Sequence, residues 1–418
     1  MKYTFSNLFT ETLKDDTVAI KSAVKYDIIE LFEERYKQEY ANLKDTNGTN
    51  QITSELEHAL FERNILVDSN FDEIAFLQQE FDKMDNETLT ITIMPTEQCD
   101  LRCVYCYEQH VDKELNAIQY DLIFDEIRNR VELGVNRVDI SWFGGEPLLK
   151  ADEIISFNQR VAEFAKEKSI FFSTGITTNG VLLNVDTFKK LLSSGVYSYH
   201  ITLDGFLHDT QRIFPDGSGS FNIIYGNIMA MLETELDFHL VVRVNISDMD
   251  FDFTFYDLFD KFCGDKRLHI LTRTVGNFGG KAANVPIYKG EDLITKVLKE
   301  HNGYLASRGH SLWDNTSYGL FKRVCYAARK NSFVVRANGR INKCTIMLEE
   351  DYNDVGFLNE NLNSISIDEI KEAPWVANRL SKSCIKCKDL SRCFNSLCPL
   401  NKVAGSKREK CCSKQGII

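Results

Sequence analysis

The sequence lacks any run of 18 consecutive apolar residues, so it predicts no membrane-spanning helix and no membrane partner. Its first eight residues, MKYTFSNL, have neither the charged start nor the apolar run of a secretion signal, and we expect a cytoplasmic protein. Positive charge is also scarce, because 49 Lys and Arg residues face 61 Asp and Glu residues. The resulting net charge of −12 disfavours nucleic acid as a partner of the whole chain.

Apolar residues and cysteines, in contrast, are plentiful. Apolar side chains make up 43% of the 418 residues, which predicts a globular protein of two or three domains. In a reducing compartment, twelve cysteines in clustered spacings indicate metal or cluster ligands rather than disulfides.

The first cysteine group has three members and no fourth. Cys99, Cys103 and Cys106 follow the spacing C-x3-C-x2-C, directly after an apolar strand candidate at 89–94 that Pro95 ends. Three thiolates can hold three corners of a cubic iron–sulfur cluster and leave one iron open, whereas structural zinc normally takes four ligands. A zinc or disulfide loop is the alternative. Tyr105, between the last two cysteines, is placed to lie against a flat ring.

From residue 89 to about 275 the pattern alternates between strands and amphipathic helices. Two of the helices are marked by Ile118, Leu122, Ile127 and Val131 and by Ile154, Phe157, Val161 and Phe164. Six β–α units in series predict a parallel sheet curled into a full or partial (β/α)6 barrel, with its chemistry at the carboxyl ends of the strands. The expected strands are 89–94, 137–143, 170–177, 197–203, 239–245 and 268–272.

Polar and glycine-containing motifs follow these strands. They are Gly144-Gly145-Glu146-Pro147, Thr178-Asn179-Gly180 and Leu203-Asp204-Gly205. The glycines allow a backbone to approach a ligand closely, and Glu146 offers a charged acceptor for an ammonium group. Each motif could also be an ordinary turn or a satisfied polar group of the core.

Together, the cysteine loop and the motif at 144–147 resemble those of the radical S-adenosylmethionine (SAM) enzymes. In that family the open iron chelates the methionine end of SAM, and the reduced cluster splits SAM to give a 5′-deoxyadenosyl radical. The resemblance implies that residues 144–147 bind the amino group of SAM and that Thr202 and Asp204 face its ribose. It implies Arg243, or alternatively Arg212, for its carboxylate, with Tyr105, Thr178 and Asn179 as further cofactor-binding residues.

Eight more cysteines lie in the C-terminal third. Residues 332–344 predict a hairpin with Asn338-Gly339 as its turn, which places Cys344 at a strand end. The cysteine pattern resembles the SPASM extension of radical SAM enzymes, which holds two auxiliary clusters, although four residues rather than three separate Cys393 from Cys398. The resemblance implies an outer cluster on Cys384, Cys387, Cys393 and either Cys411 or Cys412, and an inner one on Cys325, Cys344 and Cys398.

The inner set has only three protein thiolates. An open iron there could bind a substrate thiolate, or the site could be closed by Cys263 or by the spare member of Cys411 and Cys412. The alternative for this region is a zinc ribbon, which needs only four of the sulfurs.

Residues 1–88 form a separate small α+β unit. Asp16 and Thr17 can cap a helix with Val24, Ile28, Leu31 and Phe32 on one face, followed by a helix around 56–60, a strand at 65–67 and a helix from Asp72. This layout suits a winged-helix-like module, similar to the leader-binding modules of peptide maturases. A helical cap over the barrel is the alternative.

These observations predict three domains, at 1–88, 89–275 and 276–418, carrying three [4Fe–4S] clusters and SAM. We expect a maturase that forms thioether cross-links in a ribosomally made, Cys-containing precursor peptide. The alternatives are an anaerobic sulfatase-maturing enzyme, which forms formylglycine, and a non-catalytic iron–sulfur redox protein. Residues 379–414 carry a net charge of +8, which either compensates an anionic cluster or docks an acidic electron donor such as flavodoxin or ferredoxin.

Overall fold

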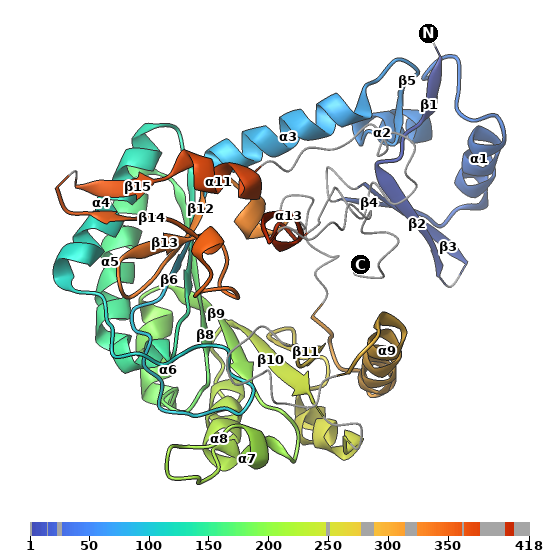
Figure 1. Cartoon of the computed structure of the whole chain (residues 1–418). Helices are drawn as coiled ribbons and strands as arrows, with labels where there is room; N and C mark the ends of the chain where they lie inside the picture. The colour runs from blue at the N-terminus through green and yellow to red at the C-terminus, as the bar shows by residue number, and fades with distance from the viewer. Residues whose placement is uncertain are drawn as a thin grey trace. The chain divides into compact units, whose positions relative to one another are not determined.

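The structure, a computed structural model, describes residues 2–14, 16–22, 27–247, 251–276, 288–313, 324–361, 363–376 and 398–404 (Figure 1). The chain divides into two compact units. One comprises residues 1–85, 314–329 and 376–418, and the other comprises residues 86–313 and 330–375. Among the described residues, no helix has the length and apolar content that crossing a membrane requires.

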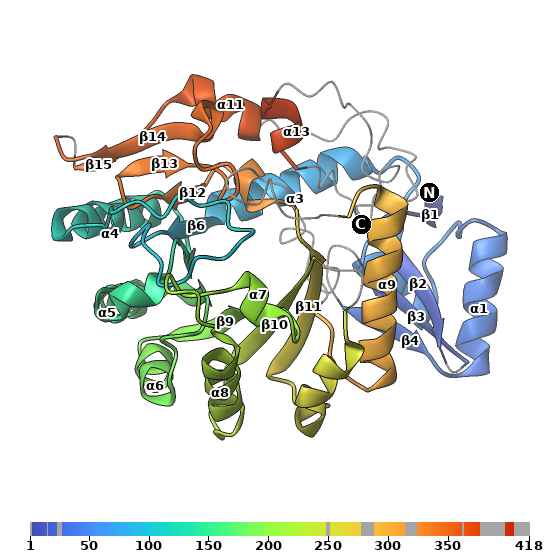
Figure 2. The same cartoon turned by 60° about the horizontal axis from the view of Figure 1, so that its bottom comes forward.

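The larger unit is built on six parallel strands, as the sequence predicted. Helices α4, α5, α6 and α8 lie along the outer side of the curved sheet (Figures 1 and 2). The strands pair in chain order, each parallel to the next. They are β6 (Thr88–Ile93), β7 (Arg137–Trp142), β8 (Phe171–Thr178), β9 (Val196–Thr202), β10 (His239–Ile246) and β11 (Leu268–Thr274). The helices between them are α4 (Ala117–Glu132), α5 (Ala151–Lys168), α6 (Val185–Ser193), α7 (His208–Gln211) and α8 (Phe221–Leu232).

Local sequence explains why these elements form. The side chains of Leu89, Ile91 and Ile93, which share one face of β6, are completely buried, as expected of a face that packs into an apolar interior. Asn116 caps α4 with a capping box, and the Asn184 side chain accepts hydrogen bonds from the first turn of α6. The sheet is therefore held by its apolar interior, and its polar residues are left for the strand ends.

A hairpin from the C-terminal third extends the same sheet. Strand β12 (Ser332–Val335) pairs in parallel with β6, and β13 (Arg340–Asn342), β14 (Asp354–Asn359) and β15 (Ser364–Ile367) follow in antiparallel order. Gly339 has φ +80° in the turn between β12 and β13, which confirms the predicted hairpin. The hairpin thus continues the barrel sheet at the edge of β6.

The N-terminal residues form the predicted α+β unit, but the helix expected from Asp16 is wrong. Residues 17–22 and 28–31 are strands that pair antiparallel, and Ile28 and Phe32 are exposed, so the described residues of this stretch form no buried helical face. The strands are β1 (Tyr3–Phe5), β2 (Phe9–Lys14), β3 (Thr17–Ser22), β4 (Ile28–Leu31) and β5 (Leu66–Asp68). The helices are α1 (Glu34–Asp45), α2 (Glu55–Glu62) and α3 (Glu73–Glu87); α2, β5 and α3 confirm the predictions for that stretch.

Shorter elements complete the described chain. They are the 3-10 helices η1 (Pro147–Lys150), η2 (Phe253–Phe262), η5 (Tyr326–Ala328) and η6 (Asp351–Asn353), and the α-helices α9 (Glu291–Ser307), α11 (Glu369–Val376) and α13 (Leu400–Val403).

Candidate functional site

A cavity of about 180 Å³ lies where the cysteine loop meets the carboxyl ends of the parallel strands. Cys99, Cys103 and Cys106 all line it, so the structure brings the three predicted thiols together. Most of the predicted strand-end residues line the same cavity: Tyr105, Gly144, Gly145, Thr178, Asn179, Thr202, Arg212 and Arg243. The cavity therefore unites motifs that are up to 144 positions apart in the sequence.

The backbone of the cysteine loop is fixed by the last residue of α7 and the segment that follows it. The Arg102 N–H donates to the Ile213 carbonyl oxygen at 2.7 Å, and the Val104 N–H donates to the Gln211 carbonyl oxygen at 2.8 Å. These two bonds lie on either side of Cys103, so the middle thiol is held by main-chain geometry.

The two glycines after β7 are required by a contact within the chain. A Cβ at Gly145 would lie 2.1 Å from the Gln98 carbonyl oxygen, and one at Gly144 would lie 2.5 Å from that of Thr96. The Glu146 N–H donates to the same Gln98 oxygen at 2.7 Å. The glycines thus let the loop after β7 lie directly against the chain that leads into the cysteine loop.

Glu146 lies behind the cavity wall and is completely buried. One of its oxygens accepts hydrogen bonds from the Thr178 hydroxyl (2.6 Å) and the Leu148 N–H (2.9 Å), and the other accepts from the Asn179 N–H (2.7 Å). Burial raises the pKa of Glu146 to about 7 even though these donors favour its charged form. In this arrangement Glu146 joins the ends of β7 and β8, and the adjacent Pro147, also buried, begins η1.

Asn179 connects the end of β8 to the cysteine loop. Its Nδ2 donates to Asp100 Oδ1 at 2.6 Å and lies 3.8 Å from Cys99 Sγ. Its Oδ1 accepts from the Val181 N–H at 2.8 Å. The side chain is therefore oriented on both sides, with its amide group toward the first thiol.

Tyr105 takes part in a polar network rather than presenting a free hydroxyl to the cavity. Its hydroxyl donates to the Asp204 carboxylate and accepts from Arg212 Nη1 (3.0 Å) and Asn245 Nδ2 (3.2 Å). The other Asp204 oxygen accepts from the Asn245 N–H at 2.8 Å. Asp204 is 2% exposed and does not line the cavity, so the structure places it as a support for Tyr105 and Asn245.

Sequence reasoning missed several residues that line the cavity. Asn245 lies two residues after Arg243, whose Nε donates to Asn245 Oδ1 at 2.8 Å. Glu108 and His110 follow the last cysteine, and His110 Nε2 lies 3.3 Å from Cys106 Sγ. The period of two along β10 and proximity to Cys106 were the signals that could have identified them. Phe143, Tyr107 and Thr274 also line the cavity.

The donor set fits an iron–sulfur cluster beside a polar ligand. Burial raises the pKa of all three thiols, that of Cys106 to about 12, so three thiolates need a bound cation to offset the loss of hydration. Two buried polar atoms on cavity-lining residues, Arg212 Nε and Glu108 Oε2, have no hydrogen-bond partner among the described residues. Such orphaned donors and acceptors are expected where a polar ligand binds.

Of the cysteines predicted to hold the auxiliary clusters, only Cys325, Cys344 and Cys398 lie among the described residues. Cys384, Cys387, Cys393, Cys411 and Cys412 lie outside the described residues, so their assignment stays a prediction. Cys344 is buried just after β13, and the Asn353 side chain accepts a hydrogen bond from its N–H at 2.9 Å. Cys325 precedes η5 and Cys398 is exposed before α13; both belong to the other compact unit.

Comparison with known proteins identifies the domain that contains this site. Residues 93–250 match the family model of the Radical SAM superfamily, the segment that contains the cysteine loop and β7 to β10. Residues 93–250 therefore form a Radical SAM domain, as the cysteine loop predicted. Two solved structures share its fold at 16% sequence identity. One is anSMEcpe with bound AdoMet and the Cp18Cys peptide, with a TM-score of 0.56 over 76% of this chain and 90% of that one.

The second is SuiB of Streptococcus suis bound to the precursor peptide SuiA, with a TM-score of 0.50 over 96% of this chain and 98% of that one. Among curated proteins, GTP 3′,8-cyclase of Clostridium botulinum (strain Hall) is 29% identical over 177 residues, 41% of this chain and 53% of that protein. The cysteine-type anaerobic sulfatase-maturating enzyme of Clostridium novyi is 26% identical over 172 residues, 38% of this chain and 44% of that protein. The chain thus spans about half the length of the curated relatives it matches.

Proposed function

We propose that this protein is a radical SAM peptide maturase that forms thioether cross-links in a Cys-containing precursor peptide. The observation that carries the proposal is the cavity shared by Cys99, Cys103 and Cys106 and the ends of β7 to β11. When bound there, a reduced [4Fe–4S] cluster and SAM supply a 5′-deoxyadenosyl radical that removes a hydrogen atom from the substrate.

The residues of the cavity have separate roles in this proposal. The three thiols would hold the cluster, and the backbone of Gly144 and Gly145, which also lines the cavity, would face the amino group of SAM. Arg212, with its unpartnered Nε, and Arg243 are the cations available for the SAM carboxylate. Thr202 and Asn245 line the side of β9 and β10, where a ribose would find hydroxyl and amide partners.

A peptide substrate is supported by the extent of the likeness to SuiB, which binds the precursor peptide SuiA. That likeness extends over 96% of the chain, whereas the likeness to anSMEcpe extends over 76%. In this proposal, the α+β unit before β6 would bind the leader segment of the precursor peptide. Deleting residues 1–88 should then weaken precursor binding far more than peptide-independent SAM cleavage.

The thioether product depends on the auxiliary cysteines. A cluster on Cys325, Cys344 and Cys398 would have an open iron that lowers the pKa of a substrate thiol and holds its sulfur near a carbon radical. Forming the bond removes one hydrogen from carbon and one from sulfur. The carbon loses a hydrogen atom to the deoxyadenosyl radical, the thiol hydrogen leaves as a proton, and one further electron is released, for which a cluster held by the auxiliary cysteines would supply the acceptor.

Formylglycine formation is the second candidate. It is favoured by the sequence similarity between part of this chain and the cysteine-type anaerobic sulfatase-maturating enzyme of Clostridium novyi. For either product an acidic donor such as flavodoxin or ferredoxin would dock on the basic residues 379–414, which lie largely outside the described residues. Docking predicts that donor-driven turnover falls steeply with salt, while turnover driven by dithionite does not.

The decisive experiment combines product analysis with a cluster variant. The reconstituted enzyme is incubated with SAM, dithionite and a Cys-containing peptide encoded beside its gene. A thioether removes two hydrogens and one titratable thiol per cross-link, whereas formylglycine creates an aldehyde that hydroxylamine captures. The variant Cys99→Ala/Cys103→Ala/Cys106→Ala should release no deoxyadenosine but retain iron at the auxiliary sites. Deoxyadenosine from this variant would refute the cluster assignment, and an aldehyde product would refute the thioether.

A further inference from the structure

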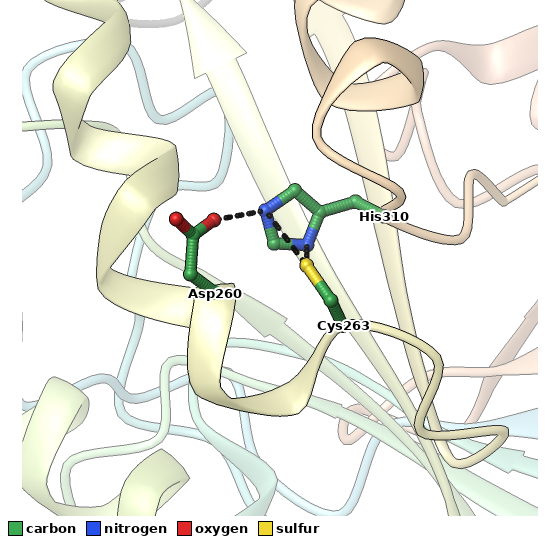
Figure 3. Close-up of side chains that lie close together, drawn as sticks. All are labelled: Asp260, Cys263 and His310. Carbon is green, nitrogen blue, oxygen red and sulfur yellow. Dashed lines mark hydrogen bonds and ion pairs between the residues drawn. The ribbon is translucent and has the colours of Figure 1, made fainter.

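A cluster of three potential metal ligands lies away from the cavity, at the beginning of β11. Asp260 at the end of η2, Cys263 just after it and His310 beyond α9 point toward one another (Figure 3). The cavity occupies the opposite end of the same strand, where Thr274 and Val275 line it. The proposed reaction makes no use of these three side chains, and the Cys263 thiol lies beside the His310 ring.

The distances between the ligand atoms match those around a tetrahedral ion. His310 Nε2 lies 3.7 Å from Cys263 Sγ and 3.1 Å from Asp260 Oδ1. Zinc bond lengths of about 2.3 Å to sulfur and about 2.0–2.1 Å to nitrogen and oxygen require separations of about 3.5 Å and about 3.3 Å at a tetrahedral angle. All three ligand atoms lie within 4.8 Å of one another. An ion would therefore need only small side-chain adjustments.

The surroundings orient the ligands as the outer shell of a metal site does. The Arg308 guanidinium binds the second oxygen of Asp260, so the first oxygen stays turned toward His310. The Arg308 carbonyl oxygen lies 3.2 Å from Cys263 Sγ and accepts the thiol hydrogen. His310 is buried and Cys263 is exposed, so an ion held here would have one side open to solvent.

We propose that Asp260, Cys263 and His310 bind a Zn²⁺-class divalent ion, with a fourth position left to water. Thiolate and imidazole ligands favour zinc over the oxygen-seeking Mg²⁺ and Ca²⁺. On binding, the thiol hydrogen leaves as a proton, a metal–sulfur bond replaces the S–H bond, and no group is oxidised or reduced. The ion would join the end of η2 to the segment after α9, which pairs with β11 through Ile270 and Leu312.

The test uses full-length, cluster-loaded enzyme, because unfilled cluster cysteines would bind zinc themselves. Wild type and Cys263→Ser are exposed to Zn²⁺, dialysed, and analysed for zinc and iron. Asp257→Asn is the matched control, since Asp257 lies one turn earlier and binds Tyr304 (2.8 Å) and Arg308 (3.4 Å) but is outside the trio. At equal iron, wild type and Asp257→Asn should retain one zinc per chain that Cys263→Ser loses.

Co²⁺ gives a second readout that depends on the ligands themselves. Binding should produce a thiolate-to-cobalt charge-transfer band in wild type and Asp257→Asn but not in Cys263→Ser, and Zn²⁺ should raise the melting temperature only where the band appears. Because Cys263 is exposed, its replacement by serine should leave the fold intact. Equal zinc in wild type and Cys263→Ser, or a cobalt spectrum that the substitution leaves unchanged, would overturn the proposal.

Discussion

Arg212 Nη1 donates a hydrogen bond of 3.0 Å to the Tyr105 hydroxyl, which ties the cysteine loop to the segment after β9. The sequence predicted separate roles for these residues, with the Tyr105 ring against a flat ligand and Arg212 near a carboxylate. The structure makes them neighbours in one network with Asp204 and Asn245. The position of the guanidinium in the cavity therefore depends on the hydroxyl of a residue that stands, in the sequence, between the candidate cluster ligands Cys103 and Cys106.

Replacing Tyr105 by Phe should loosen this network. Asp204 and Arg212, both buried, each lose a hydrogen-bond partner, and we expect the free energy of unfolding to fall by about 1–3 kcal/mol. SAM affinity should fall as well, because Arg212 is no longer held toward the cavity. Equilibrium denaturation and SAM titration measure the two effects. Tyr197→Phe is the control, since Tyr197 makes a comparable bond to Asp237 (3.1 Å) at an exposed position and should change neither quantity appreciably.

Gly145→Ala should disrupt the site by steric conflict with main chain. The new Cβ would lie 2.1 Å from the Gln98 carbonyl oxygen and 2.7 Å from that of Glu97, so the backbone must move. We expect a loss of about 1–3 kcal/mol in stability and a large loss of deoxyadenosine formation. Gly226→Ala is the matched control, because a Cβ there, within α8, meets nothing within 4 Å and should stabilise the protein by about 0.5–1 kcal/mol. If Gly145→Ala behaves like the control, the close approach does not constrain the site.

The sequence predicted the barrel well because its strands are buried apolar segments bounded by turn residues. All six strands begin and end within two residues of their predicted limits, and the motifs at their carboxyl ends meet in one cavity. The parallel arrangement itself makes this convergence predictable, since strand ends far apart in sequence share one edge. Asn245 was missed because, within a strand, it looks like any polar residue on an alternating face.

The N-terminal prediction failed for a different reason. The spacing of Val24, Ile28, Leu31 and Phe32 is helical. A helical face forms only if its apolar side chains are buried together, however, and Phe32 is 65% exposed. The competing signal was the run Thr17–Ser22, rich in β-branched residues, in which Ile20 and Ser22 are buried on one face. Likewise, the inward turn of Glu146 could not be foreseen, because it depends on donors supplied by Thr178 and Asn179 from another strand.

Glu146 should make the stability of the protein depend on pH. Its pKa is about 7 in the folded protein, against an ordinary value of 4.5. Below pH 4.5 the carboxyl is protonated in both states and has no effect. Between 4.5 and 7 the unfolded chain releases a proton that the folded chain retains, so the free energy of unfolding falls as the pH rises.

Glu146→Gln should remove this part of the slope when cluster-free protein is denatured at pH values between 4.5 and 7. The control Glu153→Gln changes an exposed carboxylate in the first turn of α5 and should leave the slope as in wild type. A slope in Glu146→Gln equal to that of wild type would show that Glu146 is ionised throughout this range.

The buried ion pair between Arg336 and Glu97 gives the last prediction. Arg336, after β12, donates to both oxygens of Glu97 at 2.9 and 3.0 Å, and Glu97 lies two residues before Cys99. Arg336→Met leaves the Glu97 charge buried without its partner, and we expect a loss of about 3–5 kcal/mol in the free energy of unfolding together with weaker cluster retention. Adding Glu97→Gln should recover much of the loss, because the stranded charge is then removed. Arg340→Met, on the same hairpin, breaks an exposed pair with Asp354 (3.2 Å) and should cost about 1 kcal/mol or less. Equal losses in the two single variants would mean that the Arg336 pair is no more important than a surface contact, and the hairpin would then have no role in fixing the cysteine loop.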